Sequence, residues 1–136
     1  MLHNTPQEFI GVDVGTVRVG LARGSDVARL AEPLKTVSAA QAINWLAEIA
    51  ATRKVDGIVV GLPRGLDGQD TSQTNLVRDW AKQAAASIKL PFYWQDEALT
   101  TQAAQTHNSK EGVDAAAAAV ILQDFLDTPE AERVRC

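Results

Sequence analysis

The run Gly57–Leu62 (GIVVGL) is continuously apolar and rich in β-branched residues. Such a run is typical of a strand that is covered on both faces, as in a parallel sheet, rather than of a strand with one face in water. Helices are predicted on either side of it in sequence. One runs from an N-cap at Ser38 to about Arg53, and a second begins near 70–72 and ends near Ile88. The sequence therefore predicts an α/β fold with parallel strands joined by crossover helices.

The amino-terminal third has the pattern of antiparallel strands. Two apolar segments, Glu8–Val14 (EFIGVDV) and Val17–Ala22 (VRVGLA), are separated only by Gly15 and Thr16, which predicts a β-hairpin. A third strand is expected over Leu30–Val37, where Pro33 restricts it to a sheet edge or a bulge. Three antiparallel strands are thus expected to open the fold.

The carboxy-terminal half supplies the remaining elements. A strand is expected over Pro91–Gln95, a short helix over about 100–106, and a last helix from about Val113 to Leu126, which Pro129 prevents from continuing. The expected order is β-β-β-α-β-α-β-α-α, in a mixed five-stranded sheet flanked by helices. We expect residues 1–136 to form a single domain.

The composition narrows the chemistry. The only cysteine is Cys136 and there are only two histidines, which excludes an intramolecular disulfide and a cysteine-based zinc site. Oxygen ligands are plentiful, with 17 acidic side chains, and these suit Mg²⁺ or Mn²⁺. No apolar run is long enough for a membrane helix, and the first residues lack the features of a signal peptide, so we expect a cytoplasmic protein with no membrane partner.

Three carboxylates are candidates for a metal site. Asp13 lies inside the first strand, where a buried carboxylate needs a metal, an arginine or backbone donors as a partner. Asp96 and Glu97 follow the last predicted strand at its carboxyl end, and side-chain alternation lets only one of them point at a given site. Asp114 begins the last helix, on the face expected to meet the sheet.

Each carboxylate also has a purely structural interpretation. Asp13 could make a turn hydrogen bond at the end of the hairpin, Asp96 and Glu97 could form a solvated turn, and Asp114 could be a first-turn acid that stabilises its helix. Together, however, three carboxylates from separate segments are what two divalent ions need to hydrolyse a phosphodiester.

Four segments resemble the YqgF-type nuclease family, which comprises Holliday junction resolvases also described as nucleases that trim ribosomal RNA precursors. The segments are GVDVGTVRVGLARGSD, VVGLPRGLDGQDT, DEALTT and VDAAAAAVILQDFLD, and they occur in the family's order over nearly the whole chain. The resemblance implies a ribonuclease H-like fold, which agrees with the predicted element order. It also implies a metal-dependent nuclease with Mg²⁺ or Mn²⁺ as cofactor and RNA or branched DNA as substrate.

The resemblance assigns roles to individual positions. It places the family's catalytic, metal-binding acids at Asp13, Glu97 and Asp114. Candidates for substrate binding are Arg18, Arg64, Thr100 and Thr101. The chain departs from the family pattern at Ala98, where an arginine is usual, at Val17, where a lysine is common, and in a short segment before the last helix.

Two other functions stay open at this point. The segment Asp13–Thr16 (DVGT) also resembles the first phosphate motif of actin-like ATPases, which indicates a nucleotide-binding protein as one alternative. The net charge of -4 and the alanine at position 98 favour another, a non-catalytic partner protein in RNA processing or transcription. The chain is expected to be a monomer or a homodimer.

Overall fold

The computed structural model describes residues 6–98 and 112–136. It contains one mixed sheet of six strands in the order β3-β2-β1-β4-β5-β6. The strands are β1 (Glu8–Val14), β2 (Arg18–Ser25), β3 (Glu32–Ser38), β4 (Gly57–Arg64), β5 (Phe92–Ala98) and β6 (Val134–Arg135). The helices are α1 (Ala39–Thr52), α2 (Ser72–Ser87) and α4 (Val113–Asp127), with a short 3-10 helix at Glu130–Glu132.

The predicted antiparallel hairpin is confirmed, and it leads into an irregular third strand. β1 and β2 pair from Glu8↔Ser25 to Val14↔Val19. β3 pairs with β2 at the sheet edge, and its register shifts so that Leu21 is opposite Lys35 while Ala22 is opposite Pro33. The proline thus occupies both an edge strand and a bulge, where its missing N–H costs the sheet no ladder hydrogen bond.

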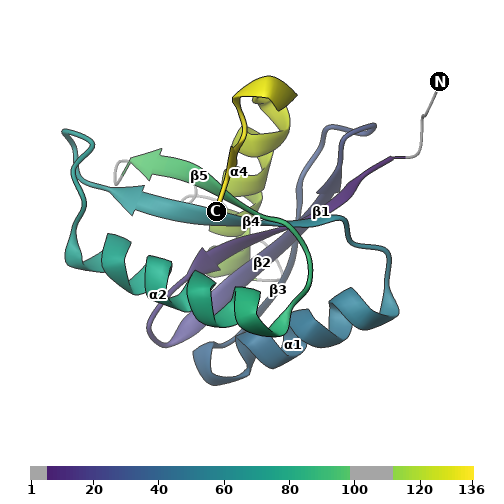
Figure 1. The fold of residues 1–136 in the computed structure, drawn as a ribbon, viewed down its shortest axis with the longest axis horizontal. Helices are drawn as coiled ribbons and strands as arrows, with labels where there is room; N and C mark the ends of the chain where they lie inside the picture. The colour runs from purple at the N-terminus through teal and green to yellow at the C-terminus, as the bar shows by residue number, and fades with distance from the viewer. Residues whose placement is uncertain (1–5, 99–111) are drawn as a thin grey trace.

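Strands β1, β4 and β5 run parallel, and helices cover both of their faces. α1 and α2 lie on one face and α4 crosses the other (Figure 1). The side chains of β1 alternate accordingly, with Val12 and Val14 in the core beneath α1 and α2, and Phe9 in the core beneath α4. The apolar run that begins at Gly57 is therefore buried on both faces, as its composition predicts.

Helix α2 begins with a reciprocal cap. Thr71 accepts a hydrogen bond from the Thr74 backbone N–H, and Thr74 Oγ1 accepts one from the Thr71 N–H at 2.9 Å. This arrangement satisfies two of the backbone donors that a helix start leaves open. Ser38 is the N-cap of α1, as expected, but its side chain makes no capping hydrogen bond.

The carboxy-terminal region differs from expectation in two ways. β5 extends to Ala98, three residues beyond the predicted Gln95, so Asp96 and Glu97 lie within the strand. A sixth strand, β6, adds two residues at the sheet edge through pairing with Tyr93 and Trp94. Two residues are too short for a periodic sequence signal, so this strand could not be predicted. The helix predicted over 100–106 lies outside the described residues.

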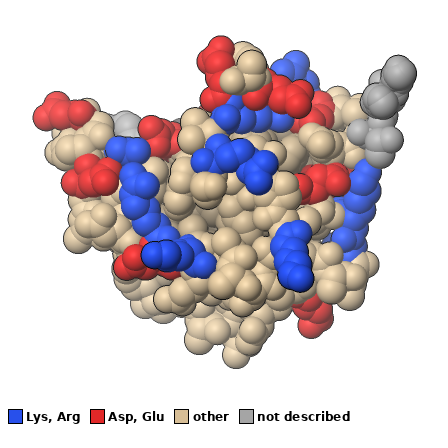
Figure 2. All heavy atoms as spheres, in the orientation of Figure 1, with Lys and Arg blue, Asp and Glu red and all other residues tan. Residues whose placement is uncertain are grey.

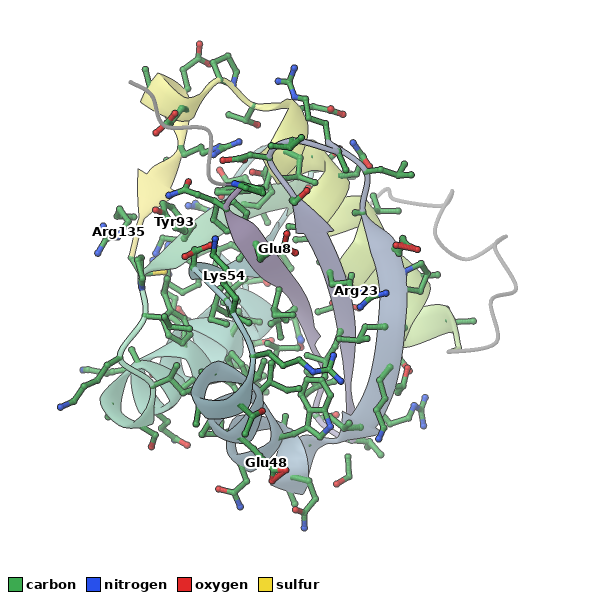
Figure 3. The ribbon with its side chains drawn as sticks, turned by 90° about the vertical axis from the view of Figure 1, so that its right-hand side faces the viewer. Glu8, Arg23, Glu48, Lys54, Tyr93 and Arg135 are labelled. Carbon is green, nitrogen blue, oxygen red and sulfur yellow. The ribbon has the colours of Figure 1, made fainter. Side chains whose placement is uncertain are left out.

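Arginines fasten the carboxy-terminal segment to the sheet. The Arg133 guanidinium lies 4.3 Å from the centroid of the Phe125 ring, and its Nη2 is 3.4 Å from Asp26 Oδ1. Only 8% of the Arg133 side chain is exposed. Two residues further on, the Arg135 guanidinium lies 5.5 Å from the centre of the Tyr93 ring. Figure 3 shows Arg135 and Tyr93 together at the sheet edge. These cation–π contacts stabilise β6, which has few backbone pairs of its own.

Among the helices that the structure describes, none has the length and apolar character needed to cross a membrane.

Candidate active site

Glycines in the sheet let α4 approach it closely. A Cβ atom at Gly11 would lie 2.7 Å from Leu122 Cβ, and one at Gly20 would overlap the backbone carbonyl of Asp114. Both contacts are closer than real Cβ atoms allow, so a larger residue at either position would push α4 away from the sheet. Because Gly20 pairs with Asp13 in the β1–β2 ladder, the start of α4 lies over the strand position beside Asp13.

Asp13 faces α4. Its neighbours Val12 and Val14 point into the opposite core, and side chains alternate along a strand. Burial, and to a smaller extent the nearby negative charge of Asp114, together raise the pKa of Asp13 from 3.8 to about 6. The first-strand aspartate and the helix aspartate therefore lie close enough to interact electrostatically.

Glu97 lies on the same side of the sheet as Asp13. In β5, Tyr93 packs in the core beneath α4, whereas Trp94 packs in the core beneath α1 and α2, so Glu97 faces α4 and Asp96 does not. The two acids thus point to opposite faces of the sheet, as side-chain alternation predicts, and the one on the α4 face is Glu97.

The pKa of Glu97 is raised from 4.5 to about 8. Burial is the largest cause, followed by a side-chain hydrogen bond with Asp124 and by the negative charges of Asp124, Asp13 and Asp96. A carboxyl group that shares a hydrogen bond with a second carboxyl group holds a proton more tightly. Glu97 is thus coupled both to Asp13 and to helix α4.

Asp124 was not among the residues that we selected from the sequence. It follows Ile121 by three positions on α4, and Ile121 packs against Gly61 of β4. Residues three apart on a helix share a face, so Asp124 is directed toward the β4–β5 side of the sheet. That spacing was the available signal, but it could be used only once α4 had been placed over β4.

Asp114 is paired with an arginine. Arg18 Nε lies 2.9 Å from Asp114 Oδ2, which links the first residue of β2 to the start of α4. The Arg18 side chain is 63% exposed and that of Asp114 is 32% exposed. Among the three candidate carboxylates Asp13, Glu97 and Asp114, Arg18 is therefore paired with Asp114.

Arg64 lies elsewhere. Two residues earlier on β4, Leu62 packs in the core beneath α1 and α2, so Arg64 points away from the α4 face. Its Nη1 is 2.9 Å from Asp70 Oδ1, and its Nε is 3.5 Å from Asp96 Oδ1. It does not join Asp13 and Glu97 on the α4 side. Thr100 and Thr101, the other two candidates for substrate binding, lie outside the described residues.

The oxygen atoms of Asp13, Glu97 and Asp114 are ligands of the kind that a hard divalent cation prefers, although Glu97 and Asp114 are directed to other partners. Within residues 6–98 and 112–136, no group of three acidic, histidine or cysteine side chains lies close enough to hold a metal ion. Asp114 is paired with Arg18, and Glu97 with Asp124. The charge of Asp13 is nevertheless repelled by those of Asp114 and Glu97, and a hard divalent cation would relieve that repulsion. The donor set therefore fits Mg²⁺ or Mn²⁺.

The turn that resembles a phosphate motif lines a separate groove. Gly15 and Thr16 border a cavity of about 610 Å³ between the starts of α1 and α2, which also contains Asp79 and Trp80. Among the described residues that line it, none is a lysine or an arginine. A cavity with a carboxylate and no cation is poorly suited to nucleotide phosphates.

Comparison with known proteins identifies the family of the chain. The chain matches the family model "RuvX: Holliday junction resolvase" over residues 7–128. It is 37% identical over 140 aligned positions to a Rickettsia felis protein named "Putative pre-16S rRNA nuclease", covering 94% of this chain and 90% of that protein, and it is 36% identical to the protein of the same name from Rickettsia canadensis.

Solved structures of similar fold come from Thermus thermophilus. RuvC aligns with a TM-score of 0.60 over 96% of this chain and 100% of that one, and RuvC bound to a Holliday junction aligns with a TM-score of 0.57. Both are 12% identical in sequence, so the likeness concerns the fold, which is ribonuclease H-like as predicted. With the family model covering most of its length, the chain belongs to the RuvX family of Holliday junction resolvases.

Proposed function

We propose that the protein is a metal-dependent nuclease that hydrolyses phosphodiester bonds in structured nucleic acid. The observation that carries the proposal is the electrostatic coupling of Asp13 to Asp114 and of Glu97 to Asp13. These acids come from β1, α4 and β5, and Asp13 and Glu97 both face α4 on one side of the sheet. Perturbed carboxyl groups of this kind are typical of functional sites.

Asp13, Glu97 and Asp114 would hold Mg²⁺ or Mn²⁺. Bound divalent ions supply activation of a water molecule and stabilisation of the oxygen that leaves the phosphorus. Glu97 and Asp114 would exchange their present partners, Asp124 and Arg18, for the cation. The Arg18 guanidinium, once released from Asp114, is a charged donor suited to a phosphate oxygen.

We infer two substrate classes from the relatives. The Rickettsia proteins are named as nucleases of pre-16S ribosomal RNA, and the family model describes Holliday junction resolvases. We therefore propose 5′-end processing of a ribosomal RNA precursor, cleavage of a four-way DNA junction, or both. The two substrates share the phosphodiester chemistry of the carboxylate site, so both belong in the test.

The test is cleavage of each labelled substrate with Mg²⁺ and with Mn²⁺. We expect Asp13→Asn to abolish cleavage, because the neutral amide is a weaker ligand for a hard cation. Asp79→Asn removes the same charge from an exposed position on α2, on the other face of the sheet, and should retain full activity. Full activity of the Asp13→Asn protein, or a wild-type protein that cleaves neither substrate with either metal, would contradict the proposal.

A further inference from the structure

A second groove lies across β5 from Glu97. It has a volume of about 460 Å³ and is bordered by the ends of β4, β5 and β6 and by helix α2. Its wall includes three arginines and one tryptophan: Arg64, Arg78, Arg133 and Trp94. Sites for small ligands typically have volumes of about 300–1,000 Å³. The groove is therefore large enough for one nucleotide.

The arginines of this groove are held in place from outside it. Asp70 accepts a hydrogen bond from Arg64 Nη1 at 2.9 Å and forms an ion pair with Arg78 Nη2 at 3.6 Å. Asp70 does not itself line the groove. Asp96 and Glu132 do line it, whereas the Arg133 guanidinium is directed to the Phe125 ring and to Asp26. A guanidinium whose orientation is fixed beforehand loses less freedom when it binds an anion.

Two of these arginines have unused hydrogen-bonding capacity. Arg64 Nε and Arg133 Nε are buried nitrogens for which the described part of the chain provides no hydrogen-bond acceptor. Arg64 Nε is 3.5 Å from Asp96 Oδ1, a distance suited to an ion pair but without hydrogen-bond geometry. Buried donors are rarely left unsatisfied. Because Arg64 Nε is buried, a phosphate oxygen or a bridging water from the groove would satisfy it only after the side chains around it shift.

An aromatic ring accompanies the cations. Trp94 borders the groove, and the Arg78 guanidinium lies 5.8 Å from the centre of its ring. Basic side chains beside an aromatic ring form the combination that binds single-stranded nucleic acid, in which an unpaired base stacks and the backbone meets the cations. Figure 2 shows lysine and arginine side chains, interspersed with aspartate and glutamate, on the face that carries α2 and the carboxy-terminal strand.

The groove and the carboxylate site are neighbours on β5. Asp96, which lines the groove, directly precedes Glu97, which faces α4 on the other side of the strand. Arg64 is paired in register with Ala98, at the same end of the sheet. Glu97 and the groove therefore lie at the same end of the sheet, one residue apart on β5.

We propose that this groove binds an unpaired nucleotide of the substrate, with Arg64 and Arg78 at its phosphate and Trp94 against its base. This inference rests on the proposed nuclease function for its biological meaning. Its physical content is separate, because binding in the groove requires neither metal nor cleavage. It assigns the protein a substrate that carries a single-stranded segment next to the bond that is cut.

The experiment measures the binding of a fluorescein-labelled single-stranded oligonucleotide, as RNA and as DNA of the same sequence, by anisotropy in EDTA. Arg78→Gln should weaken binding, and the slope of log affinity against log salt should fall by about 0.7, the value for one lost phosphate contact with a single strand. Lys82→Gln is the matched control. It removes the same charge one turn further along α2, outside the groove, and should leave the slope unchanged.

A second variant tests the base. Trp94→Leu keeps an apolar side chain and should weaken binding at least about fivefold, the lower range for the loss of one stacked base, with an unchanged salt slope. If this variant does not fold, the comparison of Arg78→Gln with Lys82→Gln still tests whether the groove binds the oligonucleotide. Equal affinities and slopes for those two proteins, or the absence of any binding by the wild type, would overturn the inference.

The outcomes for the groove and for the nuclease are distinguishable. If oligonucleotide binding depends on Arg78 but the protein cleaves neither substrate with Mg²⁺ or Mn²⁺, the inference about the groove is supported and the proposed nuclease function is contradicted. If the protein cleaves with a metal but its oligonucleotide binding does not depend on Arg78, the nuclease function is supported and the inference about the groove is contradicted.

Discussion

Replacing Gly20 by alanine tests how the site is assembled. A Cβ atom there would overlap the Asp114 carbonyl and lie 2.7 Å from the Ala115 backbone nitrogen. Because non-bonded carbon contacts settle near about 3.5 Å and the carbonyl lies closer than the nitrogen, the start of α4 must retreat by more than about 1 Å. Over-packing of this kind costs about 1–3 kcal/mol, which corresponds to a loss of about 4–12 °C in Tm for a domain of this size.

The same displacement moves Asp114 away from Asp13. A misplacement of about 1 Å at a catalytic centre can lower the rate by roughly 100-fold, so Gly20→Ala should lose far more activity than its stability alone explains. Gly57→Ala is the control. Its Cβ would meet the Phe9 ring at 3.0 Å and the Tyr93 ring at 3.1 Å, at the end of the sheet remote from the carboxylates.

Thermal unfolding and metal-dependent cleavage, measured on both variants, separate the two effects. We expect both proteins to lose stability and only Gly20→Ala to lose most of its activity below its Tm. Wild-type Tm and wild-type cleavage in the Gly20→Ala protein would refute the close approach of α4. Equal loss of activity in both variants would refute the argument that Gly20 acts by placing Asp114.

Two further predictions concern the charges of the site. Burial and like charges raise the pKa of Asp13 to about 6 and that of Glu97 to about 8. In EDTA the folded protein therefore binds more protons than the unfolded chain, and its Tm should fall as the pH rises from about 5 to about 8. Asp124→Asn should flatten that decline, and a wild-type Tm that rises over this interval would contradict the assignment. Arg18→Gln should change the free energy of unfolding by less than about 1 kcal/mol, since the ion pair with Asp114 is largely exposed. The same variant should bind Mn²⁺ more tightly in calorimetry, because Asp114 loses its competing cation. Weaker Mn²⁺ binding would show that Arg18 instead holds Asp114 in position.

Much of the fold could be predicted because its signals are local. The apolar run from Gly57 is long enough to identify a strand buried on both faces, and the Gly15–Thr16 interruption identifies a hairpin. Pro33 restricts its strand through its own missing donor, independently of the rest of the chain. Each of these signals depends on residues that are adjacent in sequence. The two-residue strand β6 has no such signal and exists only because the edge of β5 and the Tyr93 ring are there to receive it.

The site divides in the same way. The sequence alone determined that Asp13 would lie within a strand and that Asp96 and Glu97 would point to opposite faces, because alternation is a property of the backbone. Only the tertiary structure decided that Glu97 faces α4, that Arg18 pairs with Asp114, that Asp124 reaches Glu97, and that Arg64 lies on the other face. Those outcomes depend on where α4 crosses the sheet, and that position is fixed by glycines in three strands and the small side chains of a helix far from them in sequence.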